Sequence, residues 1–290
     1  MMQELFWIPF AEFGFMQRAL VACLALGLVS GPIGVLLVMR RMSLAGDAIS
    51  HSVLPGAAVG YLIAGMSFAV MGVAAFMTAM LVALMASGVS NLTSQREDAS
   101  LAAFYLIALA LGVAIISMNG SNVDLMHLLF GSVLAVDRSG LILVAGAVSL
   151  ALVVLALIWR PLLAGSFDPL FVAQHGKAGR RATQLFMFTV VLTFVASFQT
   201  LGTLMAVGLL MLPATAARFW VRDISRACAL ASLMAMASGA VGLLVSYHAS
   251  VPSGPAIVLT AGCFYLISLL AGTHDSLLAH SLKVTRHKES

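Results

Sequence analysis

The sequence predicts an all-α integral membrane protein that crosses the bilayer about nine times. Apolar residues make up 61% of the 290 residues and charged residues only 9%, whereas about a quarter of the residues in a soluble domain are charged. The mean hydropathy is +1.06. Apolar runs of about 20 residues, long enough for a helix to cross about 30 Å of hydrocarbon, alternate with short polar segments. We therefore expect residues 1–290 to form a single transmembrane domain.

Each expected span is an apolar run that ends where charged residues, Gly or Pro accumulate. The nine spans expected in this way cover residues 16–39, 46–65, 68–90, 99–118, 140–159, 183–198, 200–217, 227–246 and 256–273. The seventh span contains Pro213, which is expected to bend or break its helix near one end. Small residues in the same span favour close helix packing.

The basic residues predict the orientation of the chain. If the N-terminus lies outside, the connections after spans one, three, five and seven and the C-terminal tail lie in the cytoplasm. These parts hold 13 of the 15 Lys and Arg residues, and only Arg18 and Arg138 lie outside. The positive-inside rule then places the N-terminus outside and the C-terminus inside. Because these loops also explain the pI of about 9.3, we expect lipid and no nucleic acid as a partner.

The second expected span carries Asp47 and His51, which are four residues apart and so share one helix face. Carboxylate and imidazole together suit zinc, manganese or ferrous iron. A carboxylate within the hydrocarbon costs about 3 kcal/mol and is usually functional. Pro55 and Gly56 are expected to interrupt the helix nearby, as in helices that line a substrate path. We predict that the pair contacts a passing metal; the alternative is a capping Asp47 beside a hydrogen-bonded interior His51.

One chain offers two ligands at this position, whereas a metal ion takes four or more. A two-fold dimer would bring two such pairs together. Asp124 and His127, three apart on the outer side, form a second possible pair at the entrance of a cation path. A helix cap beside a solvated histidine explains Asp124 and His127 equally well.

Two polar segments are too short or too charged to be spans. Residues 121–137 are expected to form an interfacial or re-entrant helix on the outer side. The loop at about 166–182 begins with Phe-Asp-Pro and ends in a Gly-Lys-x-Gly-Arg-Arg run. This pattern predicts a short amphipathic cytoplasmic helix capped by Asp168. A soluble partner could bind such a helix.

The sequence lacks the motifs of the common nucleotide-binding and hydrolytic sites. It has no GxxxxGK[ST] run, so the chain cannot by itself hydrolyse ATP through a P-loop. It also has no HExxH and no GxSxG run. We therefore do not expect an enzyme, and the energy for any transport must come from a gradient or from another subunit.

Four segments in series resemble the ABC-3 family, the permeases of zinc, manganese and ferrous-iron uptake ABC transporters. They are GPIGVLLVMRRMSLAGDAISHSVLPGAAVGYL (31–62), DLMHLLFGSVL (124–134), FDPLFVAQHG (167–176) and QTLGTLMAVGLLMLPATAARFW (199–220). The GDAxSHxxLPG run is the most specific part. The resemblance implies the type II ABC importer permease fold of the cobalamin-transporter class, a dimer in the inner membrane, and delivery of metal by a solute-binding protein.

The resemblance also implies roles for particular residues. A cytoplasmic ATPase docks on a coupling helix in this family, and the matching segment here contains Asp168, Pro169, Phe171 and Gly176. The metal pathway of the family is attributed to the residues that match Asp47 and His51. Asp124 matches a position with an outer-gate or structural role.

The sequence thus predicts the permease of an ATP-driven importer that moves metal through a dimer interface by alternating access, without a permanently bound cofactor. The Irving–Williams order favours zinc as the cargo on affinity. We rank manganese second and ferrous iron third. Two alternatives remain open: a gradient-driven secondary metal transporter that needs no ATPase, and a membrane structural or receptor protein without transport.

Overall fold

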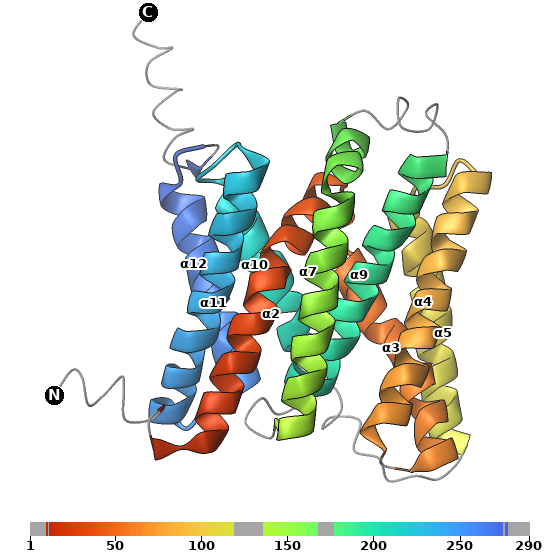
Figure 1. The fold of residues 1–290 in the computed structure, drawn as a ribbon, viewed down its shortest axis with the longest axis horizontal. Helices are drawn as coiled ribbons and strands as arrows, with labels where there is room; N and C mark the ends of the chain where they lie inside the picture. The colour runs from red at the N-terminus through yellow and green to blue at the C-terminus, as the bar shows by residue number, and fades with distance from the viewer. Residues whose placement is uncertain are drawn as a thin grey trace, which may run out of the picture. The chain divides into compact units, whose positions relative to one another are not determined.

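The computed structural model describes residues 10, 12–65, 67–118, 136–167, 177–274 and 276–277. Its main elements are helices, and no strand occurs among the described residues (Figure 1). The helices are α2 (Gly14–Met39), α3 (Ala45–Ala64), α4 (Phe68–Leu92), α5 (Glu97–Met118), α7 (Arg138–Phe167), α9 (Lys177–Leu201), α10 (Thr203–Arg218), α11 (Ile224–Ala249) and α12 (Ser253–Ala271). The prediction of an all-α membrane protein is confirmed for this part of the chain.

Seven of the helices in the described ranges are long and apolar enough to cross a membrane: α2, α4, α5, α7, α9, α11 and α12. Helix α10 has only 16 residues. Helix α3 has 20 residues, but Asp47, His51 and several serines lower its apolar content. Length and composition therefore support seven of the nine expected spans, and the spans at 46–65 and 200–217 stay predictions.

Two expected features of the helices differ in the structure. Residues 200–217 do not form one helix, because Gly202 has a φ of 85°, a conformation that glycine adopts readily. Helix α9 therefore ends at Leu201 and α10 begins at Thr203. The expected interruption at Pro55 is wrong, since this proline lies inside the continuous helix α3. Pro213 also lies inside a continuous helix, α10, so it does not break that helix, and the bend expected there stays a prediction. A proline within a membrane helix is tolerated where neighbouring groups satisfy the freed backbone groups.

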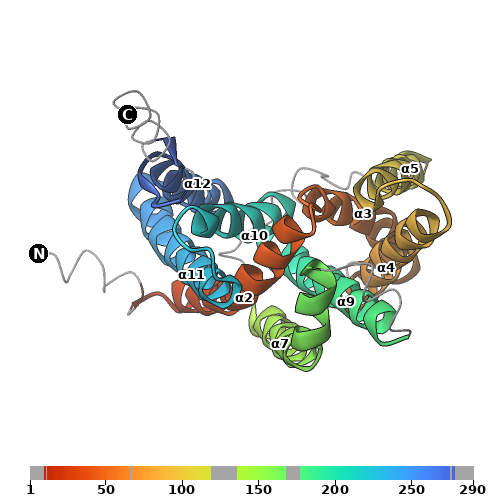
Figure 2. The ribbon, with the colours of Figure 1, turned by 90° about the horizontal axis from the view of Figure 1, so that it is seen from above.

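The chain divides into two compact units. One contains residues Met1–Val38, Ser132–Leu141 and Gly208–Ser290, and the other contains Met39–Gly131 and Ile142–Val207. In the first unit α11 and α12 lie side by side (Figures 1 and 2). A Cβ added at Gly242 of α11 would come within 2.9 Å of the backbone nitrogen of Ile257 in α12. Glycine thus allows the close backbone contact that membrane helices use to associate.

Asp223 is the N-cap residue of α11 in the first unit, and its side chain accepts a hydrogen bond from the backbone N–H of Arg226 at 2.9 Å. Replacing Asp223 with Ala is expected to lower the free energy of unfolding by about 1 kcal/mol, because a backbone N–H of the first turn loses its partner. Asp223→Asn keeps an acceptor and should stay near wild type. Thermal unfolding of the purified protein in detergent measures both, and equal losses for the two variants would contradict the capping role.

Helix α3 is the central element of the second unit, where it packs against α4, α5 and α9. Figures 1 and 2 show α3, α4 and α5 side by side. Gly56 of α3 lies so close to α4 that an added Cβ would collide with the carbonyl oxygen of Ala74. On the other side, a Cβ at Gly112 of α5 would come within 2.9 Å of the backbone nitrogen of Pro55. Helix α3 is therefore in backbone contact with both neighbours.

The connection before α3 is fixed by Arg40, which also belongs to the second unit. The Arg40 guanidinium lies over the ring of Phe186 in α9, 5.0 Å from its centroid, as in cation–π pairs. Burial lowers the pKa of Arg40, and the nearby charge of Glu97 at the start of α5 partly offsets that shift. The cation–π contact and the attraction to Glu97 tie the entry of α3 to α5 and α9.

Candidate metal site

Asp47 and His51 lie in the first half of α3, and Asp47 belongs to its first turn. The N-cap is Leu44, and no side chain caps the helix. The alternative reading of Asp47 as a helix cap is therefore wrong. A carboxylate in the first turn is still favoured by the helix dipole. The Asp47 carboxylate contacts His51 instead of a backbone N–H of α3.

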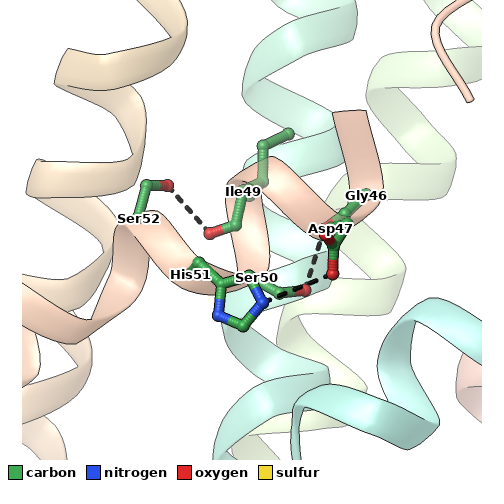
Figure 3. Close-up of polar contacts among 6 residues, drawn as sticks. All are labelled: Gly46, Asp47, Ile49, Ser50, His51 and Ser52. Carbon is green, nitrogen blue, oxygen red and sulfur yellow. Dashed lines mark hydrogen bonds and ion pairs between the residues drawn. The ribbon is translucent and has the colours of Figure 1, made fainter. Parts of the chain in front are cut away.

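The Nε2 atom of His51 lies 3.4 Å from Oδ1 of Asp47, one helical turn away (Figure 3). Two ligands that each bind a metal at about 2.1 Å and at a tetrahedral angle are about 3.4 Å apart. The two side chains thus already have the spacing that one divalent ion needs. The His51 side chain is 29% exposed and the Asp47 side chain 53%, so an ion could reach them without unfolding α3.

The second ring nitrogen of His51 has a different environment. Nδ1 is buried and has no hydrogen-bond partner among the described residues. A histidine in a permanent metal site almost always donates this second N–H to a carboxylate, carbonyl or water, which raises metal affinity. The hydroxyls of Ser50 and Ser52 donate to the α3 carbonyls of Gly46 and Ile49, each at 2.8 Å (Figure 3). The pair has the ligands of a metal site without the supporting hydrogen bond that strengthens retention.

Asp47 and His51 form a pair and not a larger cluster. Within the described ranges, no group of three or more His, Cys, Asp or Glu side chains could hold a metal ion. An ion bound by the pair therefore takes its remaining ligands from outside the His, Cys, Asp and Glu side chains of the described ranges. The expectation that one chain supplies two ligands, fewer than the four or more that a metal ion takes, agrees with the described residues.

The other predicted site residues cannot be placed. Asp124 and His127 lie outside the described residues, as do Asp168, Pro169, Phe171 and Gly176 of the expected coupling segment. Their roles stay predictions. The structure also places Tyr105 of α5 beside His51, a neighbour absent from the sequence prediction. No spacing rule connects residues on two different helices, so the local sequence contained no signal for it.

Comparison with known proteins identifies the family to which this chain belongs. The sequence profile of the ABC 3 transport family matches residues 12–272. The chain belongs to this family. The resemblance predicted from the GDAxSHxxLPG run and the three other segments is thereby confirmed.

Several relatives in the family match nearly end to end. The manganese import system permease protein ScaB of Streptococcus parasanguinis is 32% identical, with 93% of this chain and 95% of the relative covered. The manganese transport system membrane protein MntC of Listeria innocua is 35% identical, with 92% and 94% covered. The solved structure of PsaBC from Streptococcus pneumoniae in complex with Fab superposes with a TM-score of 0.82 at 31% identity, covering 97% of this chain and 100% of that chain. ScaB and MntC are thus named as membrane components of manganese import or transport systems.

Proposed function

We propose that this chain is the membrane permease subunit of an ATP-driven importer of a divalent transition metal. The 3.4 Å approach of Asp47 Oδ1 and His51 Nε2 is the observation that carries the proposal. Manganese is the favoured cargo, since the curated relatives described above are named for manganese. Zinc comes second and ferrous iron third. Manganese thus replaces zinc, which ligand chemistry alone had favoured. Asp and His also suit manganese, and water molecules can complete the coordination of the manganese ion.

The proposed assembly needs other chains. Because the sequence has no GxxxxGK[ST] run, ATP hydrolysis requires a separate cytoplasmic ABC ATPase. This ATPase docks on the coupling loop at about 166–182, and a solute-binding protein delivers the metal outside. A second copy of the permease adds a second Asp47–His51 pair, which makes four protein ligands at the dimer interface. The proposal includes the type II permease fold. The chain lies in the inner membrane, with its N-terminus outside and its C-terminus in the cytoplasm.

The residues of α3 then act as a transient binding site. The Asp47 carboxylate supplies negative charge, which offsets the loss of water from the entering ion. Neutral His51 donates the Nε2 lone pair and makes the site selective for transition metals over magnesium and calcium. Because Nδ1 of His51 has no hydrogen-bond acceptor among the described residues, metal affinity stays moderate and the ion can leave when access alternates. Asp124 and His127 are proposed to attract the cation at the outer entrance.

Reconstitution into liposomes distinguishes this function from gradient-driven transport. With the ATPase, the solute-binding protein and ATP, the permease is expected to accumulate manganese in the lumen that corresponds to the cytoplasmic side. Without the ATPase, or with a non-hydrolysable nucleotide, accumulation should stay at the level of empty liposomes. Manganese uptake by the permease alone, driven by an imposed ion gradient, would contradict the proposal and support the secondary transporter.

A further inference from the structure

Tyr105 of α5 lies beside the proposed metal ligand His51. The centroids of the two rings are 6.0 Å apart and their planes are inclined by 27°. Aromatic rings attract each other in offset stacked arrangements at centroid distances of about 4.5–7 Å. No hydrogen bond joins the Tyr105 hydroxyl to another residue in the described part of the chain. The ring is therefore the part of Tyr105 that interacts with His51.

The position of Tyr105 is set by tight packing between α3 and α5. Leu101, Ala108 and Gly112 lie four, three and seven residues from Tyr105, respectively, and share its helix face. Leu101 and Ala108 are buried, and Gly112 leaves no room for a Cβ against Pro55. The register that places Gly112 against Pro55 thus also places Tyr105 beside His51. The stacking is determined by a backbone contact and not by the two side chains alone.

The His51 imidazole depends on this neighbour for its orientation. Its Nδ1 atom has no hydrogen-bond partner among the described residues, and its other contact is with Asp47, whose side chain is half exposed. Metal-binding histidines are ordinarily oriented by a hydrogen bond to the second nitrogen. Here the face of an aromatic ring takes the place of that bond.

We propose that Tyr105 is a positioning residue for the transported metal: its ring holds the His51 imidazole so that Nε2 faces Asp47. The inference rests on the proposed function and identifies a residue that acts through His51 without touching the ion. Without the ring, the imidazole rotates more freely and Nε2 is directed toward Asp47 less often. Metal then binds less tightly, whereas the later steps of transport, in which Tyr105 takes no part, keep their rates.

The test uses the permease assembled with its ATPase in proteoliposomes, supplied with the solute-binding protein and ATP, and measures KM and maximal rate for Mn2+ uptake. Tyr105→Leu is expected to raise KM about twofold to tenfold, the range that corresponds to the loss of one aromatic pair, with the maximal rate unchanged. Tyr105→Phe keeps the ring and should match wild type. Phe104→Leu is the matched control. It removes a ring from the position of α5 directly before Tyr105, which lies on a different face of the helix.

The outcomes separate this inference from the proposed function. If His51→Ala abolishes uptake while Tyr105→Leu leaves KM unchanged, the positioning role is wrong and the metal site stands. A KM for Tyr105→Phe as high as that of Tyr105→Leu would also contradict it, since the hydroxyl would then be the active group. Full uptake by His51→Ala would overturn the proposed site itself. If Tyr105→Leu does not assemble, Tyr105→Met keeps most of the volume without the ring and is expected to raise KM in the same way.

Discussion

Replacing His51 with Ala is expected to abolish ATP-driven manganese uptake by the assembled transporter. Among the described residues, no third His, Cys, Asp or Glu side chain joins Asp47 and His51, so the variant loses one of the two ligands proposed for each chain. Even loss of a supporting group around a metal ligand costs about 10- to 100-fold in affinity, and loss of the ligand itself should cost at least as much. Asp47→Asn, which removes the charge and keeps the size of the side chain, should reduce uptake by a similar factor.

His248 provides the matched control for His51. It is an exposed histidine at the end of α11, and its Nδ1 atom lies 2.9 Å from the carbonyl oxygen of Leu244 in the same helix. His248→Ala should therefore transport manganese as wild type does. Uptake is measured with radioactive manganese at matched amounts of permease in the membrane. Wild-type uptake by both His51→Ala and Asp47→Asn would eliminate the pair as the metal path.

Replacing Gly56 with Ala is expected to have the largest effect on the structure of the second unit. The added Cβ would collide with the carbonyl oxygen of Ala74 and the hydroxyl of Thr78 in α4. A backbone carbonyl cannot move aside without shifting its helix, so α3 and α4 must separate. Overpacking of this kind costs about 1–3 kcal/mol in the free energy of unfolding. Because α3 carries Asp47 and His51, uptake should also fall strongly.

Gly88→Ala is the control for Gly56→Ala. Gly88 also lies within a helix of the second unit, α4, but nothing lies within 4 Å of a Cβ added there. This substitution should leave stability unchanged or raise it slightly, because alanine favours a helix over glycine. Thermal unfolding in detergent compares the stability of the two variants, and uptake in proteoliposomes compares their transport. Equal unfolding temperatures for Gly56→Ala and Gly88→Ala would show that the α3–α4 contact is looser than the structure indicates.

Seven of the nine expected spans and the shared helix face of Asp47 and His51 were predicted correctly from sequence neighbours. Apolar runs indicated the membrane helices, since each needs only enough apolar residues in a row. The spacing of Asp47 and His51 indicated a shared helix face, because residues four apart always lie on one face. The local arrangement agrees with this, with 3.4 Å between Oδ1 and Nε2.

Properties that depend on contacts between helices could not be predicted in this way. Pro55 suggested a break in the second span, yet α3 continues past it, and the adjacent Gly56 marks a close contact with α4. The contact of Tyr105 with His51 depends on the packing of α5 against α3. Local sequence patterns do not determine the register between two helices, that is, which of their residues face each other. The kind of metal was also undetermined, because carboxylate and imidazole accept several divalent ions.

The central claim, that His51 binds the transported metal, is tested most directly by pulsed electron paramagnetic resonance of Mn2+ bound to the purified transporter. A histidine nitrogen bound to Mn2+ modulates the electron spin echo. The wild-type and His248→Ala proteins are expected to show this nitrogen modulation, and His51→Ala to lack it. Nitrogen modulation that persists unchanged in His51→Ala would show that His51 does not coordinate the metal and would contradict the account.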